Sequence, residues 1–122
     1  MYNHHIIDLT FGSERQLINL VGIRKILLEC CEISGVSVLH DYFHRFDDTN
    51  GFTGIICLAE SHISIHTWPE KSKMYIDVFI CNDECSNTFM KLLTDKLIMS
   101  APWPGSWQDK CIKHDIRTIE RM

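Results

Sequence analysis

The chain has 122 residues, of which 45% are hydrophobic and 23% are charged, and this composition is typical of one soluble globular domain spanning residues 1–122. The formal net charge of -4 gives no electrostatic basis for binding nucleic acid or an anionic membrane surface. No apolar run approaches the roughly 18 residues that a membrane-spanning helix needs.

The first third of the chain predicts a strand followed by a long helix. Residues 4–9 are rich in Ile and Leu and indicate a short strand. Residues 13–16 have the Ser-x-x-Gln pattern of a capping box, which marks a helix start. Apolar residues then recur at helical spacing, and Gly35 is placed to end a helix of about six turns in a left-handed conformation.

Three further strands are predicted in the middle of the chain. Residues 36–46 and 52–60 form a hairpin around residues 47–51, where Asn-Gly is the strongest turn signal in the sequence. Residues 61–67 alternate polar and apolar, so the strand directs its two isoleucines to one face. The other face receives His62, Ser64 and His66. Pro69 cannot donate a ladder hydrogen bond and should end this strand.

The last part of the chain predicts a strand, a helix and another strand. Residues 74–81 alternate cleanly, and Cys81 falls on the face opposite the aliphatic side chains. Residues 86–99 carry an apolar stripe at helical spacing, and the prolines at positions 102 and 104 should end that helix. A final strand is expected near residues 111–116.

This order of elements implies an α+β fold, a two-layer sandwich in which two helices cover one face of a mainly antiparallel sheet. The other face of the sheet must be polar or covered by another molecule. It therefore has room for an active site and for a dimer contact.

Residues 60–70 are the densest cluster of chemically active side chains, with two serines, two histidines and two glutamates. A solvated antiparallel strand explains part of this pattern. A zinc site is a second reading, since His62 and His66 share a face, but no third ligand stands at a recognisable spacing. We therefore expect no metal site. Trp68 is expected to have a structural role.

Three segments carry a resemblance to a known family. They are Glu-Ser-His-Ile-Ser-Ile-His-Thr-Trp-Pro-Glu at residues 60–70, Phe-His-Arg-Phe at residues 43–46 and Ile-Asp-Val-Phe-Ile-Cys at residues 76–81. Together they resemble the cleavage-site region of S-adenosylmethionine decarboxylase proenzymes of the short prokaryotic type. The resemblance extends over residues 3 to 100.

The resemblance implies a precursor that cleaves itself at Glu60–Ser61 into a β chain, residues 1–60, and an α chain, residues 61–122. The Ser61 hydroxyl attacks the Glu60 carbonyl, and elimination then leaves a pyruvoyl group at the α-chain terminus. This group forms a Schiff base with the substrate and replaces pyridoxal phosphate. No metal is implied.

Individual roles also follow from the resemblance. His66 occupies the position of the base in processing, and histidine titrates near neutral pH. Thr53 stands where the family usually has a serine that assists processing, and its extra methyl group predicts slow self-cleavage. Cys81 stands at the position of the proton donor in decarboxylation, although packing in the core is the commoner role of a cysteine.

The expected substrate is S-adenosylmethionine, decarboxylated as the aminopropyl donor for spermidine. Phe46 matches the residue that stacks on adenine, and Glu70 matches the acid that binds the ribose hydroxyls. Asp47 and Asp48 either form a solvated hairpin tip or face the cationic side chain of another substrate. Decarboxylation of L-arginine or L-ornithine therefore stays open as an alternative.

A non-catalytic paralogue that pairs with an active subunit is another alternative, although intact Ser61, His66 and Cys81 argue against it. The family also implies a homodimer of αβ units. The start of the chain lacks the basic and apolar regions of a signal peptide, so we expect a cytoplasmic protein whose six cysteines are reduced.

Overall fold

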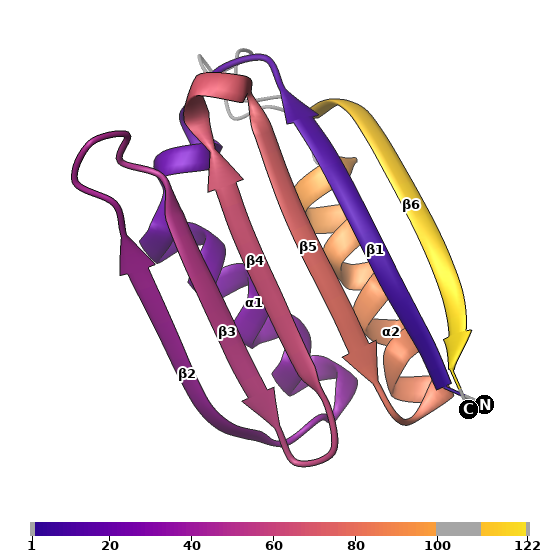
Figure 1. Ribbon diagram of the computed structural model, residues 1–122. Coiled ribbons are helices and arrows are strands. Elements are labelled where there is room, and N and C mark those ends of the chain that lie inside the picture. Colours follow the sequence, from indigo (N-terminus) through magenta and orange to yellow (C-terminus); the bar gives the residue numbers. More distant parts are fainter. Residues whose placement is uncertain (1, 100–110, 122) are drawn as a thin grey trace.

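The computed structural model describes residues 2–99 and 111–121 as a six-stranded sheet with two helices on one face (Figure 1). The strands are β1 (Tyr2–Phe11), β2 (Val38–Arg45), β3 (Phe52–Leu58), β4 (His62–Trp68), β5 (Lys73–Ile80) and β6 (Cys111–Arg121). The helices are α1 (Leu20–Ser34) and α2 (Asp83–Leu93), with 3-10 turns η1 (Gln16–Ile18) and η2 (Pro69–Lys71) and a π-helical turn η3 (Thr94–Ile98). No helix within these described residues is long and apolar enough to cross a bilayer.

The strand order is β2-β3-β4-β5-β1-β6, and all neighbouring strands are antiparallel. Figure 1 shows both helices behind the sheet, with the opposite face of the sheet toward the viewer. We call that uncovered side the open face. The predicted α+β two-layer sandwich is confirmed.

Alternation along the central strands separates the two faces as predicted. On β5 the side chains toward the helices are at most 1% exposed, namely those of Met74, Ile76, Val78 and Ile80. On β4 the two isoleucines are buried on the same side, while His62, Ser64 and His66 lie on the open face. The open face also exposes large side chains, those of Tyr42, Ile55, Trp68, Tyr75 and Ile119.

The start of α1 differs from the prediction. The capping-box pattern at Ser13 does not begin the helix: the Ser13 Oγ accepts from the Arg15 N–H at 3.4 Å, and the next element is a short 3-10 turn. The η1 turn follows, and α1 begins after Asn19, whose Oδ1 accepts from the Gly22 N–H at 3.1 Å. The helix has 15 residues, about four turns rather than six. Its predicted end at Gly35 is confirmed, with φ of 84°.

The C-terminal elements also have different bounds. α2 begins at Asp83 rather than at Ser86, because the Asn82 side chain caps it by accepting from the Cys85 N–H at 2.9 Å. The residues after Leu93 form the π-helical η3 instead of a continued α-helix. β6 extends beyond its predicted end, and the two prolines expected to end the helix lie outside the described residues.

The buried His5 side chain joins three elements. Its Nδ1 lies 2.9 Å from the Thr118 Oγ1 of β6, and its Nε2 lies 3.1 Å from the Ser86 Oγ of α2. A neutral imidazole has one donor and one acceptor, which two hydroxyl groups can satisfy. Burial lowers the pKa of His5, and the neighbouring His4 lowers it further. Folding therefore favours the neutral form of this imidazole.

We predict that acid destabilises the fold through His5. The unfolded chain takes up this proton near pH 6.5, above the pKa of the folded state, so the free energy of unfolding decreases as the pH falls below about 6.5. Urea unfolding between pH 8 and pH 5 measures this slope. His5→Leu should flatten it, whereas the exposed His114→Leu should keep the wild-type slope. Equal slopes in wild type and His5→Leu would contradict this role.

Candidate active site

The Glu60–Ser61 dipeptide lies in the turn between β3 and β4. The Leu58 N–H donates to the Ser61 carbonyl at 3.0 Å and closes this turn. Because β4 pairs with β5 in antiparallel register, the turn lies beside the end of β5, where Cys81 follows. Two segments 20 residues apart in sequence thus meet at one point.

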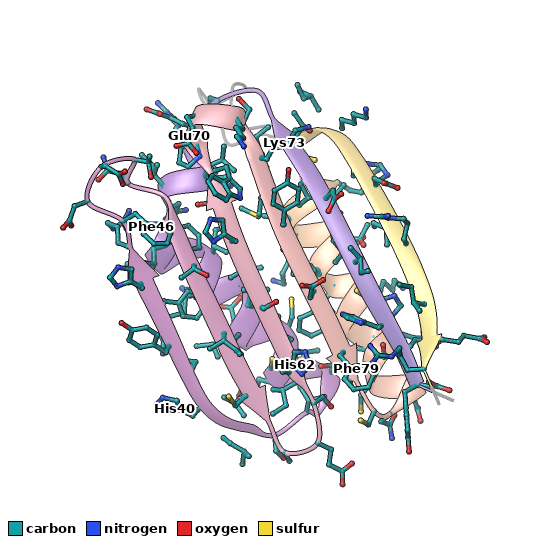
Figure 2. All side chains as sticks on the ribbon, in the orientation of Figure 1. His40, Phe46, His62, Glu70, Lys73 and Phe79 are labelled. Atoms are coloured by element: carbon teal, nitrogen blue, oxygen red, sulfur yellow. The ribbon has the colours of Figure 1, made fainter. Side chains whose placement is uncertain are left out.

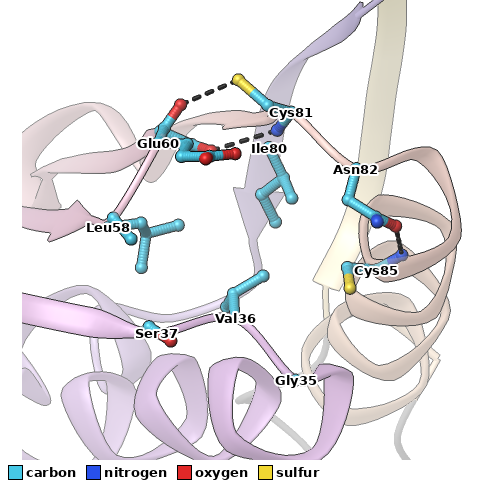
Figure 3. Close-up of a pocket in the computed structure, with 11 residues that line it drawn as sticks. Gly35, Val36, Ser37, Leu58, Glu60, Ile80, Cys81, Asn82 and Cys85 are labelled. Atoms are coloured by element: carbon cyan, nitrogen blue, oxygen red, sulfur yellow. Dashed lines mark hydrogen bonds between the residues drawn. The ribbon is translucent and has the colours of Figure 1, made fainter.

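Cys81 contacts both sides of the peptide bond between Glu60 and Ser61 (Figure 3). Its backbone N–H donates to the Ser61 Oγ at 3.0 Å, and its thiol donates to the Glu60 carbonyl oxygen at 2.8 Å. The first bond orients the hydroxyl, and the second polarises the carbonyl that this hydroxyl would attack. The geometry therefore suits an intramolecular acyl shift.

A pocket of about 250 Å³ opens next to this peptide bond. It is lined by residues 35–37 after α1, residues 58–61, residues 80–82 and Cys85 (Figure 3). Sequence analysis identified Ser61 and Cys81 but not the lining from residues 35–37. No motif marks that segment, which lies at the pocket because Val38 pairs with Leu58 and the Ala59 N–H donates to the Ser37 carbonyl at 3.0 Å.

His66 lies near the other end of β4, among aromatic rings. Its centroid is 5.5 Å from that of Phe46 and 4.5 Å from that of Trp68. Burial lowers the pKa of His66, and the Glu70 carboxylate partly opposes this effect. The imidazole is therefore neutral at pH 7 and able to accept a proton.

Thr53 lies directly opposite His66 on β3. Its hydroxyl donates to the carbonyl of Ile65 at 3.3 Å, so the side chain lies along the strand pair beside the histidine. The structure thus brings together the two residues that sequence analysis assigned to processing, but it places them away from Ser61.

A second pocket, of about 210 Å³, surrounds His66. Its lining includes Phe46, Trp68 and Glu70, together with Asp48 and Thr49 from the β2–β3 hairpin. Asp47 is not among the lining residues. Trp68, for which a structural role is expected, is 40% exposed and also forms part of the pocket wall. The alternation of β4 predicts this position, because it puts Trp68 on the same face of the sheet as His66.

The two pockets lie at opposite ends of the sheet. Figure 2 shows Phe46 and Glu70 toward one end of the open face, with His62, which follows Ser61, and Phe79 toward the other. Five residues of extended chain separate Ser61 from His66, a span of about 16 Å. Within one chain, His66 cannot reach the Ser61 Cα. Among residues 2–99 and 111–121, no group of three or more His, Cys, Asp or Glu side chains could hold a metal ion.

The family profile described as S-adenosylmethionine decarboxylase matches residues 3–101, which include both pockets. The chain belongs to this family. One member, an S-adenosylmethionine decarboxylase proenzyme of Thermococcus kodakarensis, is 36% identical over 83 residues, covering 68% of this chain and 57% of that protein. Another proenzyme of the same name, from Persephonella marina, is 44% identical over 78 residues, covering 63% of this chain and 58% of that protein.

The family fold extends over nearly the whole chain. The crystal structure of the adenosylmethionine decarboxylase from Aquifex aeolicus superposes with a TM-score of 0.76, over 99% of this chain and 90% of that one. Its sequence identity is 24%, so this comparison bears on the fold alone. The matches to the two proenzymes span less than two thirds of their lengths.

Proposed function

We propose that the chain is a pyruvoyl-dependent S-adenosylmethionine decarboxylase that is made as a precursor and cleaves itself between Glu60 and Ser61. The observation that carries the proposal is the pair of hydrogen bonds from Cys81 to the Ser61 hydroxyl and to the Glu60 carbonyl. Membership of the family indicates which reaction this geometry would serve. The relatives described above are named for S-adenosylmethionine, and their proenzyme name agrees with self-processing.

Processing begins when the Ser61 Oγ attacks the Glu60 carbonyl carbon. The peptide C–N bond breaks, its nitrogen takes a proton, and an ester joins Glu60 to the Ser61 side chain. Removal of the Ser61 Cα proton then expels the Glu60 carboxylate and leaves a dehydroalanine. Water hydrolyses the imine tautomer of this residue, releasing ammonia and leaving a pyruvoyl group on residues 61–122.

The pyruvoyl group supplies a ketone that takes up the substrate amine and accepts the electrons left when carbon dioxide departs. Cys81 remains beside this position after cleavage, because its backbone belongs to the β5–α2 junction rather than to the cut turn. Its thiol is therefore placed to return a proton to the substrate carbon.

We further propose that the complete site forms between two copies of the chain. Ser61 and Cys81 lie at one end of the sheet, while His66, Thr53 and Phe46 lie toward the other. The open face carries large exposed apolar side chains, including Tyr42, Ile55 and Tyr75, which a second sheet would bury. A two-fold axis that lies between the two sheets and runs across the strands puts the Ser61 end of one chain over the His66 end of the other.

In this arrangement the second pocket becomes the binding site for the adenosyl group. Phe46 offers a ring for stacking, and Glu70 offers a carboxylate for the two ribose hydroxyls. The neutral imidazole of His66 faces the partner's reacting centre as the base for elimination. Decarboxylation of arginine or ornithine has no support among the relatives described above. A non-catalytic role does not explain the contacts at Glu60–Ser61.

We assign the enzyme to the cytoplasm, where its product would serve as the aminopropyl donor for spermidine. The cysteines are consistent with a reducing compartment, because all six are free thiols in the structure.

Self-cleavage is the first expected outcome. Intact-mass analysis of purified protein should find two chains, residues 1–60 and 61–122, with the second lighter by one ammonia than a serine-terminated fragment. Ser61→Ala removes the nucleophile and should stay whole. If the wild-type chain also stays whole after prolonged incubation, the proposed function is wrong.

A second experiment distinguishes the roles of His66 and Cys81. His66→Ala lacks the base for elimination, so it should accumulate an ester that hydroxylamine cleaves. Cys81→Ala keeps the backbone N–H that holds the Ser61 hydroxyl and should still be cleaved, but its release of carbon dioxide should fall by about a hundredfold or more. Wild-type carbon dioxide release from Cys81→Ala would remove the thiol from the mechanism.

A further inference from the structure

The β2–β3 hairpin presents one carboxylate, that of Asp48, to the adenosyl pocket. The hairpin is held by the Phe46 N–H donating to the Gly51 carbonyl at 2.8 Å and by the Asn50 N–H donating to the Phe46 carbonyl at 3.0 Å. Asn50 adopts a positive φ of 62°, as an asparagine in a tight turn readily does. These hydrogen bonds thus give the tip of the hairpin a defined conformation.

Hydrogen bonds of side chains within the hairpin tip accompany a conformation in which Asp48, and not Asp47, lines the pocket. The Asp48 Oδ1 accepts from the Thr49 N–H at 2.9 Å, and the Thr49 Oγ1 accepts from the Gly51 N–H at 3.2 Å. Asp48 and Thr49 both line the pocket, whereas the adjacent Asp47 does not. The two neighbouring aspartates are both exposed and differ in contact with the pocket and in the bond from the Thr49 N–H.

The charges around the pocket favour a cation. Asp48 on the hairpin and Glu70 on η2 both bring a carboxylate to the lining of the pocket that Phe46 and Trp68 also line. Neither carboxylate forms an ion pair within the described residues. His66 between them is neutral, because burial lowers its pKa. Among the described residues no lysine or arginine lines the pocket, and the Lys71 ammonium lies 4.9 Å from the centre of the Trp68 ring.

We propose that Asp48 determines specificity by selecting the positive charge on the substrate's sulfur. The inference rests on the proposed function, in which Glu70 binds the ribose hydroxyls. We place the 5′ sulfur of a ribose held there beside Asp48, which lines the same pocket. A sulfonium gains Coulomb attraction from the Asp48 carboxylate, whereas a neutral thioether with the same adenosyl group gains none. The ligand class is therefore cationic sulfonium nucleosides.

The test compares two probes that differ by one methyl group and one charge, 5′-methylthioadenosine and its S-methyl sulfonium derivative. Neither has an amine at the sulfur end, so neither is decarboxylated. Their dissociation constants are measured by calorimetry on wild type, Asp48→Asn and Asp47→Asn. Asparagine preserves the size of aspartate and the bond from the Thr49 N–H, so both variants keep the turn.

Wild type should prefer the sulfonium, and Asp48→Asn should reduce this preference by about threefold to tenfold. Asp47→Asn removes the same charge outside the pocket and should change the preference by less than about twofold. An unchanged preference in Asp48→Asn, or an equal loss in Asp47→Asn, would overturn the inference and leave the proposed decarboxylation intact. Failure of wild type to bind either probe would refute the adenosyl pocket itself and the inference with it.

Discussion

The extended geometry of β4 is the constraint on which the other features of the site depend. A strand rises by about 3.3 Å per residue and cannot bend back on itself, so residues at its two ends stay apart. Ser61 precedes this strand and His66 lies near its far end. A chain that needs both residues at one reacting carbon must obtain one of them from another molecule. The same strand that orients the two groups therefore supports the proposed association of two chains.

Antiparallel strand pairing determines where Cys81 and Thr53 lie in the site. The register of β4 with β5 brings the turn that holds the Glu60–Ser61 bond beside the end of β5, where the thiol and backbone N–H of Cys81 contact it. The register of β3 with β4 sets Thr53 opposite His66 in the same way. Positions fixed by sheet hydrogen bonds are more rigid than loop positions, and such rigidity favours reactions that depend on orientation.

Much of the fold could be predicted from the sequence because alternation in the strands is strong. The buried isoleucines of β4 and its open-face histidines were read correctly from a period of two. The start of α1 was predicted wrongly. Ser13 and Asn19 are both residues that can cap a helix, and in the structure the Asn19 side chain caps α1. Local sequence does not show which of two competing caps the packed structure selects.

The site was only partly predictable for a different reason. Sequence analysis named Ser61, His66 and Cys81 as one catalytic set, and nothing in a linear motif shows that its members lie at opposite ends of a sheet. The motif also could not distinguish Asp48 from Asp47, because that difference depends on side-chain bonds within the hairpin tip. Motifs identify residue types, whereas the distances between them depend on strand length and register.

We infer that one chain supplies Ser61 and another supplies His66 to each site. This inference is tested most directly by co-expressing a His66→Ala chain and a Ser61→Ala chain with different affinity tags and purifying the dimers that carry both tags. The account predicts that the His66→Ala chain is cleaved in these mixed dimers, although each variant stays whole when expressed alone. A His66→Ala chain that stays whole in the mixed dimers would contradict a shared site.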